Sequence, residues 1–382
     1  MAVALDTLLD RKHGEQALLG LDREVLRSVF EGHDLPGYRA DQLMRWVYHR
    51  GVTGFEQMTD VSKDLRSQLP EWFRIDMPEV AAEQVASDGT RKWMLRLKGG
   101  QAVETVFIPE DDRGTLCISS QVGCALDCQF CSTAQGGLNR NMTAAEIVSQ
   151  VLFAKQALGE YEKGQRIISN VVFMGMGEPL ANYHNLLPAL KILLDDFGFA
   201  LSKRRVTVST SGLVPFIDRL NDEADVALAV SLHAPNNRLR DELVPINRKY
   251  PIETLLAACD RYTSGRGRQI QVMYEYVMLN GVNDEASHAA ELVKLLRHRP
   301  SKVNLIPFNP FPGSDYQRSS NNRVERFSKI LRDGGVFCSV RRTRGDDIDA
   351  ACGQLVGKVE SRQSRRLGDV ASKIADDGAH LH

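Results

Sequence analysis

After residue 114, short β-rich runs of this chain alternate regularly with helical stretches. Runs rich in β-branched and aromatic residues predict strands at 115–119, 170–174, 205–210, 225–231, 271–278 and 302–307. The clearest helix between them begins at the capping box Thr143-Ala-Ala-Glu146 and ends at Gly159. Strands that alternate with helices pair in parallel, as βα units. Six such units predict an α/β fold with an open, partial (β/α)6 TIM-like barrel.

The chain before this barrel follows other patterns. Short helices are predicted near 21–27, 38–48 and 63–69. Strands are predicted between residues 80 and 109, where the pair Gly99-Gly100 is a hairpin signal. We therefore expect four parts, which are a helical N-terminal accessory domain (1–77), a β-hairpin extension (78–109), a core barrel (110–346) and a C-terminal segment (347–382).

Composition sets only broad limits on function. The formal net charge of the 382 residues is −1, so the overall charge does not indicate a nucleic-acid partner. No apolar run approaches the roughly 20 residues of a membrane span, and the N-terminus lacks the apolar core of a secretory signal. The seven cysteines are clustered rather than spread as a disulfide framework, which favours the reducing cytoplasm. A monomer is expected.

Three cysteines lie in a loop that follows the first predicted barrel strand. Cys124, Cys128 and Cys131 have the spacing C-x3-C-x2-C, and Phe130 precedes the last of them. Three thiolates are one fewer than a closed zinc site or an electron-transfer iron–sulfur cluster normally takes. A [4Fe–4S] cluster held in this way keeps one iron open to a small molecule. The alternative is a zinc site in which Cys117 is the fourth ligand.

Polar or glycine-rich motifs follow the later predicted strands. They are Met174-Gly-Met-Gly177-Glu178-Pro179, Ser209-Thr-Ser-Gly212, Ser231-Leu232-His233-Ala234 and Asn309. Each by itself is also compatible with an ordinary turn or cap. Ligands of such barrels sit at the C-terminal ends of the strands, so we expect these groups to surround one pocket. Glu178 is suited to bind an ammonium group there.

Together these motifs resemble a known family. The cysteine loop and the Gly-Glu-Pro motif resemble the radical S-adenosylmethionine (SAM) superfamily. With Asn309-Pro-Phe-Pro-Gly313 and Arg344-Gly-Asp-Asp-Ile-Asp-Ala-Ala-Cys352-Gly-Gln354, nearly the whole chain resembles the bacterial dual-specificity RNA adenine-C2 methyltransferases. The resemblance implies a barrel of the radical SAM type, an N-terminal domain that binds RNA, and one [4Fe–4S] cluster on the three loop cysteines. It implies that two SAM molecules are used per turnover and that SAM is bound by Gly177, Glu178, Ser209, Ser231, Leu232, His233 and Asn309.

The resemblance also implies a reaction on carbon 2 of an adenine in the peptidyl-transferase region of 23S rRNA, and on the adenine beside the anticodon of certain tRNAs. Cys352 is expected to carry the methyl group, and a 5′-deoxyadenosyl radical to activate it. Cys117 is expected to release the product by forming a transient disulfide with Cys352. Glu104 is the expected proton acceptor, with a solvated strand residue as the alternative. Flavodoxin and its reductase are the expected electron donors.

Other interpretations stay open at this point. A sister family methylates carbon 8 of the same ribosomal adenine and confers antibiotic resistance. A zinc-stabilised RNA-binding protein without catalysis, or a radical enzyme that acts on a protein or metabolite, shares some of these features. Cys259 and Cys338 are expected to be ordinary buried residues. Basic runs at 203–205, 341–344 and 362–366 are candidate RNA contacts, although most charge runs are simply solvated.

Overall fold

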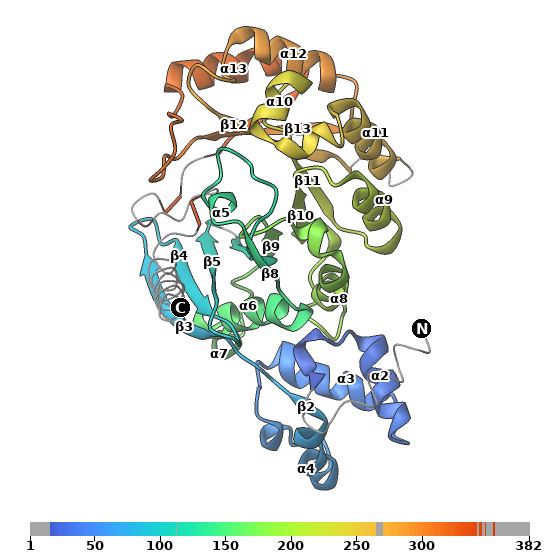
Figure 1. Ribbon diagram of the computed structural model, residues 1–382. Helices are drawn as coiled ribbons and strands as arrows, with labels where there is room; N and C mark the ends of the chain where they lie inside the picture. Colours follow the sequence, from blue (N-terminus) through green and yellow to red (C-terminus); the bar gives the residue numbers. More distant parts are fainter. Residues whose placement is uncertain are drawn as a thin grey trace, which may run out of the picture.

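A curved sheet runs through the centre of the molecule (Figure 1). The structure is a computed structural model and describes residues 16–111, 113–264, 270–341, 344–345, 348 and 354–355. In this described part the sheet has ten strands, in the order β14-β13-β12-β11-β10-β9-β6-β5-β4-β3. The parallel strands are β6 (Gly114–Cys117), β9 (Asn170–Phe173), β10 (Val206–Thr210), β11 (Ala227–Ser231), β12 (Val272–Met278), β13 (Ser301–Pro307) and β14 (Phe337–Val340). All six predicted barrel strands are present, which confirms the predicted architecture.

Strand β14 was not predicted, and within the described residues it makes the parallel part of the sheet one strand longer than expected. It pairs with β13 at the edge of the sheet. Phe337 is 64% exposed and only Cys338, as predicted, is buried. A four-residue edge strand with one buried side chain lacks the apolar pattern from which strands are recognised.

Helices cover the outer face of the curved sheet (Figure 1). They are α6 (Ala144–Ala157), α8 (Tyr183–Leu194), α9 (Val214–Glu223), α11 (Ile252–Thr263), α12 (Ala286–Leu296) and α13 (Asn321–Asp333), and shorter pieces include α7 (Glu160–Lys163) and α10 (Asn237–Leu243). Helix α6 starts as predicted. The Thr143 hydroxyl accepts a hydrogen bond from the Glu146 N–H at 3.2 Å, and the Glu146 carboxylate accepts one from the Thr143 N–H at 2.9 Å. Ile147, Val151 and Ala154 are buried against the sheet, as their spacing requires.

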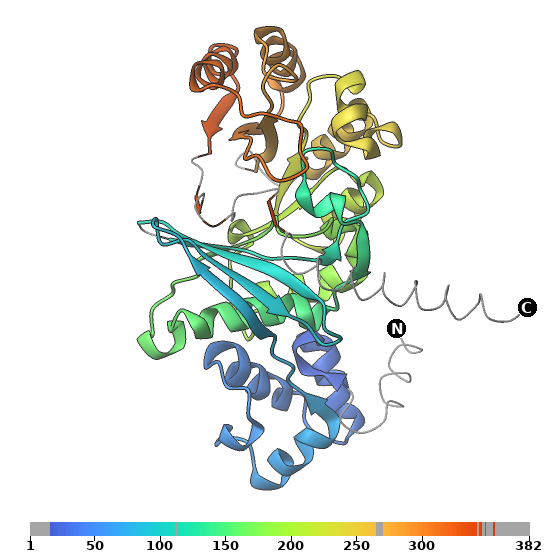
Figure 2. The same cartoon turned by 60° about the vertical axis from the view of Figure 1, so that its left-hand side comes forward.

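The β-hairpin extension continues the barrel sheet rather than standing apart from it (Figure 2). Strands β3 (Glu79–Val85), β4 (Arg91–Arg96) and β5 (Ala102–Pro109) are antiparallel, and β5 pairs with β6. The predicted turn joins β4 to β5. Gly99 and Gly100 both have φ values in the left-handed region, +100° and +90°, which explains the glycine pair.

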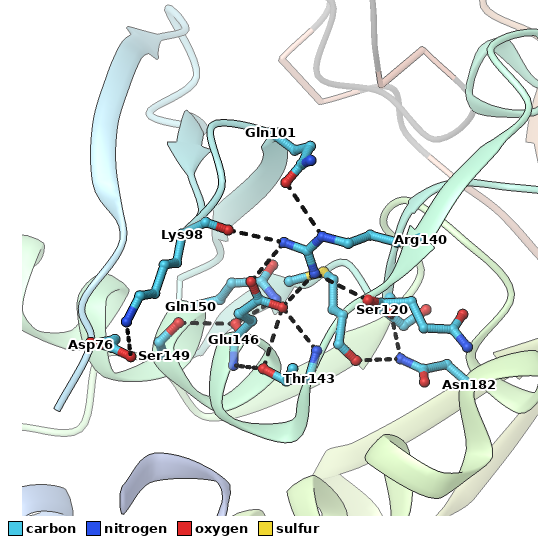
Figure 3. A network of polar contacts seen from close by, with 12 residues as sticks. Asp76, Lys98, Gln101, Ser120, Arg140, Thr143, Glu146, Ser149, Gln150 and Asn182 are labelled. Atoms are coloured by element: carbon cyan, nitrogen blue, oxygen red, sulfur yellow. Dashed lines mark hydrogen bonds and ion pairs between the residues drawn. The ribbon is translucent and has the colours of Figure 1, made fainter. Parts of the chain in front are cut away.

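An arginine ties this hairpin to the cysteine loop (Figure 3). The loop leaves the antiparallel pair β7 (Gln121–Gly123) and β8 (Leu138–Asn141), and Arg140 lies on β8. Its guanidinium binds the Glu146 carboxylate with two bonds of 2.8 and 2.7 Å, and also donates to Gln101 Oε1 at 3.3 Å and to the Lys98 carbonyl at 3.5 Å. The base of the loop is therefore fixed to the start of α6 and to the β4–β5 turn.

The N-terminal domain is helical, as predicted, and packs against the barrel (Figure 1). It contains α2 (Arg23–Gly32), α3 (Tyr38–Met44), a π-helical turn (Arg45–His49) and α4 (Lys63–Trp72), with the short pair β1 (Gln16–Ala17) and β2 (Phe73–Arg74). Arg23 Nε contacts Asp195 Oδ2 at 2.9 Å, and the guanidinium groups of Arg23 and Arg45 lie 5.0 and 4.6 Å from the centre of the Phe197 ring. None of the helices in the described residues combines the length and hydropathy that a membrane span requires.

Candidate active site

A cavity lies at the C-terminal ends of the parallel strands, where the cysteine loop meets the sheet. Most of the predicted site residues line it, namely Cys124, Cys128, Cys131, Gly177, Glu178, Ser209, Ser231, His233 and Asn309. The fold thus brings together groups that are up to 185 residues apart in the sequence. Leu232 does not line the cavity. Its side chain is fully buried, and its backbone N–H donates to the Glu275 carbonyl at 3.1 Å.

The three cysteines all line this cavity but differ in exposure. Cys128 is buried and its sulfur lies 3.9 Å from Ser211 Oγ, whereas Cys124 and Cys131 are partly exposed. Burial raises the pKa of Cys124 to about 11, and it raises the pKa of Cys128 as well. The free thiols of Cys124 and Cys128 therefore stay protonated near neutral pH, and a positively charged metal is needed to make these two groups thiolates. In the described parts of the chain, no three His, Cys, Asp or Glu side chains are grouped in a way that would hold a metal ion as they stand.

Asn309 indicates that the cavity is shaped for a polar ligand. Its side chain is only 7% exposed and lies at the cavity wall after β13. Its Oδ1 atom is buried and has no hydrogen-bond partner among the residues that the structure describes. An unsatisfied buried amide oxygen costs about 1–3 kcal/mol, so a ligand that donates to it gains binding energy. Three soft thiolate donors beside such a group fit a [4Fe–4S] cluster together with SAM.

Glu178 holds two loops together at the cavity. One carboxylate oxygen accepts from the Leu180 N–H at 3.1 Å and the other from the Ser211 N–H at 2.8 Å. Burial raises its pKa to about 6, against the effect of these hydrogen bonds. Gly177 precedes it with φ +98°, and a Cβ there would lie 2.5 Å from the Gln121 Cβ. Glycine is required at 177 because the motif packs tightly on β7 and because the backbone has a positive φ there.

Two family models match the chain. The Radical SAM superfamily model matches residues 118–293, and the model of the ribosomal RNA large subunit methyltransferase N-terminal domain matches residues 16–75. The dual-specificity RNA methyltransferase RlmN of Alkalilimnicola ehrlichii is 55% identical over 362 residues, which are 94% of this chain and 99% of that protein. The chain belongs to the dual-specificity RNA methyltransferase family.

A solved structure agrees with this assignment. The radical SAM methyltransferase of Sphaerobacter thermophilus is 46% identical to this chain, with a TM-score of 0.83. The match covers 89% of this chain and 99% of the chain of that structure. The family resemblance and the radical SAM fold are therefore confirmed. The chain is an enzyme, so the interpretation as a non-catalytic zinc-stabilised RNA-binding protein is wrong. A radical SAM enzyme of this family uses a [4Fe–4S] cluster and SAM.

Sequence reasoning missed Arg240, which holds in place the backbone of two loops of this methyltransferase site. Its side chain is fully buried, and its guanidinium donates to the backbone oxygens of Ser211, Ser231 and Leu232 at 2.7, 3.1 and 3.1 Å. It also donates to Asn247 Oδ1 at 2.9 Å. Arg240 thereby links the loops that follow β10 and β11. The run Asn237-Arg-Leu-Arg-Asp-Glu-Leu243 reads as a solvated charged helix, so no local signal distinguishes this arginine.

Glu275 was also missed. It lies on β12, lines the cavity and accepts a hydrogen bond from the Ser209 hydroxyl at 3.0 Å. Burial raises the pKa of its carboxyl group, while the positive charge of Arg341 and the Ser209 hydroxyl act in the opposite direction. A signal was present, because Glu275 is the one charged residue in the apolar run Val272-Met-Tyr-Glu-Tyr-Val-Met278.

Glu104 is buried, so its interpretation as a solvated strand residue is wrong. It is 6% exposed on β5, its Oε1 lies 3.9 Å from Lys92 Nζ, and its carbonyl accepts from the Ser119 hydroxyl at 2.7 Å. Cys117 is buried at the end of β6. Cys352 lies outside the described residues, so the role of each and the disulfide between Cys117 and Cys352 stay predictions.

Strand register places Cys117 on the face of the sheet that carries the cavity. Cys117 is the register partner of Val172, and Val172 is the partner of Thr207. Ser209, which lines the cavity, is two residues beyond Thr207 on the same strand, and side chains two apart share a face. On the other side of β6, Cys117 faces Val106 of β5, two residues after Glu104. Glu104 and Cys117 are thus on the cavity face, although neither lines the cavity itself.

Proposed function

We propose that this enzyme methylates carbon 2 of an adenine in 23S rRNA and of the adenine beside the anticodon in certain tRNAs, and that it uses two SAM molecules per turnover. The relative from Alkalilimnicola ehrlichii carries the name dual-specificity RNA methyltransferase, which supports an RNA substrate. The single observation that carries the proposal is the cavity that joins the three-cysteine loop to the polar ends of five strands. A monomer that takes electrons from a flavodoxin system is the simplest form.

The cofactor roles follow from the cavity lining. Cys124, Cys128 and Cys131 would hold the cluster, and when bound the cluster supplies the electron that cleaves SAM to a 5′-deoxyadenosyl radical. Glu178 and Asn309 flank the space beside the cysteines. The acceptor oxygen of Asn309 lacks a partner among the described residues and suits a hydroxyl or an ammonium donor of SAM. The other predicted binding residues that line the cavity, Gly177, Ser209, Ser231 and His233, keep the roles that the family resemblance gives them. Leu232 does not line the cavity, and its role in binding SAM stays a prediction.

Cys352 is the proposed methyl carrier. Its thiolate attacks the methyl carbon of one SAM molecule, so the new S–C bond forms as the sulfonium C–S bond breaks and S-adenosylhomocysteine leaves. The 5′-deoxyadenosyl radical removes one hydrogen atom from this methyl group. The resulting methylene radical forms a bond to carbon 2 of adenine, which links Cys352 to the RNA.

Cys117 and Glu104 then release the product. Cys117 sulfur bonds to Cys352 sulfur as the bond from Cys352 sulfur to the methylene carbon breaks, and that carbon gains a hydrogen to become the methyl group. In this step the covalent adduct and the Cys117 thiol together lose one proton and one electron. Glu104 accepts the proton from carbon 2, and an oxidised one-electron carrier accepts the electron. The shared cavity face of Glu104 and Cys117 supports these roles.

The basic runs differ in their suitability for RNA. Lys203 pairs with Asp225 at 2.5 Å and Arg205 donates to Asn170 at 3.0 Å, and both lie where β10 begins, opposite the cavity. Arg341 follows β14 at the cavity end of the sheet. Of the described basic residues in these runs, Arg341 is therefore the proposed contact to the RNA backbone, whereas Arg344 lies 3.8 Å from Asp88 Oδ2.

The proposed function is tested by substituting the methyl carrier Cys352 and the resolving residue Cys117 one at a time. Cys352→Ala is expected to abolish methylation of rRNA and tRNA while it still cleaves SAM to 5′-deoxyadenosine, with Cys338→Ala as the matched control that methylates normally. Methylation at the wild-type rate by Cys352→Ala would show that this cysteine carries no methyl group.

Cys117→Ala is expected to accumulate a covalent protein–RNA adduct, seen as an RNA band that shifts in a denaturing gel and returns after protease treatment. Free RNA alone would exclude resolution by Cys117. Digestion of the wild-type product to nucleosides decides the position, because 8-methyladenosine in place of 2-methyladenosine would favour the sister reaction.

A further inference from the structure

Two hydrogen bonds lie on either side, in the sequence, of the stretch that includes Cys352. On one side, the Thr133 hydroxyl donates a hydrogen bond to the Leu355 carbonyl at 2.9 Å. On the other, the Gly345 N–H donates to Asp88 Oδ2 at 3.2 Å. We propose that Thr133 and Asp88 are positioning residues for Cys352, because Thr133 holds Leu355 at the cavity and Asp88 holds Gly345 at the hairpin extension. The proposal rests on the proposed role of Cys352 as the methyl carrier.

The Thr133 anchor is part of the cavity wall. Thr133 lies in α5 (Ser132–Gln135), which begins directly after Cys131, and both Thr133 and Leu355 line the cavity. Their exposed fractions are 4% and 3%. Gln354 adds a second contact, because its Nε2 donates to the Pro310 carbonyl at 3.1 Å. A buried leucine with a satisfied carbonyl is a firm attachment, since breaking it exposes apolar surface and leaves the Thr133 hydroxyl unpaired.

The Asp88 anchor comes from the hairpin extension. Asp88 lies in the turn between β3 and β4, where its Oδ1 accepts from the Thr90 N–H at 2.9 Å. Its second oxygen is left to accept from Gly345, and Arg344 Nη1 lies 3.8 Å from the same atom. Gly345 has φ +63°, a conformation that favours glycine, so this residue suits the turn that presents its N–H to Asp88.

The two anchors have a direct consequence for the reach of the carrier cysteine. Leu355 is three positions beyond Cys352 in the sequence, and a chain of this length spans at most about 11 Å. A thiol that is tethered at this length from the cavity wall has a high effective concentration there. It has to meet two partners in turn, first the methyl group of SAM and then the adenine. Loss of an anchor is therefore expected to slow methyl transfer without changing how SAM is cleaved.

The experiment compares Thr133→Val, which replaces the hydroxyl with a methyl group, with Thr133→Ser, which keeps the hydroxyl. Each reconstituted full-length enzyme is assayed for iron and sulfide, for 5′-deoxyadenosine, for methylated RNA, and for the added methyl on Cys352 by mass spectrometry. We expect Thr133→Val to keep the iron content and the 5′-deoxyadenosine rate of the wild type. Methyl-Cys352 and methylated RNA should fall about five- to tenfold, the effect of one buried hydrogen bond, and Thr133→Ser should restore them.

Asp88→Ala tests the second anchor, with Glu83→Ala on the neighbouring exposed strand β3 as the matched control. Asp88→Ala should raise the amount of 5′-deoxyadenosine formed per methylated RNA, and Glu83→Ala should not. An unchanged ratio in both Thr133→Val and Asp88→Ala overturns the proposal. If the iron content and the methylated RNA of Thr133→Val fall by the same factor, the proposal is also overturned. The hydroxyl would then only stabilise the cysteine loop that binds the cluster. If the wild-type enzyme methylates RNA without ever carrying a methyl on Cys352, the proposed function itself fails.

Discussion

The carboxylate of Glu178 accepts a hydrogen bond from the backbone N–H of Ser211 at 2.8 Å, which joins the loop after β9 to the loop after β10. Its other oxygen is bound by the Leu180 N–H at 3.1 Å. The residue that the sequence indicates as an ammonium ligand is therefore also a brace between two walls of the cavity. Its effect on SAM binding and its effect on stability are expected to appear together.

Glu178→Gln is expected to lower both the affinity for SAM and the stability of the enzyme. The glutamine keeps one acceptor oxygen but turns an NH2 group toward a backbone N–H, so one buried hydrogen bond is lost. We expect the affinity for SAM to fall about tenfold, and the free energy of unfolding to fall by about 1–2 kcal/mol. Anaerobic calorimetric titration with SAM and urea unfolding measure the two effects. An unchanged affinity would remove Glu178 from the SAM site.

Arg240→Met is expected to destabilise the enzyme strongly. Methionine fills much of the same volume but leaves the Ser211, Ser231 and Leu232 carbonyls without their buried donor. The free energy of unfolding should fall by about 3 kcal/mol or more. Arg238→Met, an exposed position on the same helix α10, is the control and should change stability by less than about 0.5 kcal/mol. Equal effects of the two substitutions would contradict the bracing role.

Substitution of single cysteines distinguishes a bound iron–sulfur cluster from a bound zinc ion. Cys124→Ala leaves two thiols in the loop, so after anaerobic reconstitution we expect loss of the visible absorbance and of most iron and sulfide. Cys338→Ala, on β14 and away from the cavity, should retain about four irons per chain, as a [4Fe–4S] cluster requires. Stoichiometric zinc with little iron in the reconstituted wild-type protein would contradict the cluster assignment.

His233 makes stability depend on pH. Burial, together with the positive charge of Arg240, lowers its pKa to about 3, and its Nδ1 accepts from the Val277 N–H at 3.0 Å. Between pH 3 and the ordinary histidine value near 6.5, the unfolded chain binds a proton that the folded chain does not. Stability is therefore lost as the pH falls below about 6.5, by about 1.4 kcal/mol from this residue between pH 8 and pH 5.5.

His233→Asn is the variant that measures this contribution. Asparagine tolerates the positive φ of 59° at this position and has an oxygen that can accept from Val277. The variant should lose about 1.4 kcal/mol less than the wild type over the same pH range in urea unfolding. The same pH dependence of stability in both proteins would show that the folded enzyme protonates this imidazole as readily as the unfolded chain does.

Local patterns were sufficient to predict the barrel strands, the capping box of α6 and the hairpin turn at Gly99-Gly100. Each depends on the period of apolar residues or on backbone freedom within a few positions. The same patterns failed where a residue is determined by distant partners. Glu104 looks like a solvated strand residue but is buried, and Arg240 looks like a surface charge but is among the most deeply buried side chains. Strand β14 was missed because it buries a single side chain.

By itself the sequence determined the chemistry available to this enzyme, since three thiols in one loop, a glycine-rich motif and isolated cysteines are read from spacing alone. Only the tertiary structure decided which of these groups meet. The register from β5 through β6 and β9 to β10 puts Glu104, Cys117 and Ser209 on one face. The contact of Thr133 with Leu355 closes a separation of 222 residues. Such contacts depend on long-range strand order and burial, which no local stretch of sequence encodes.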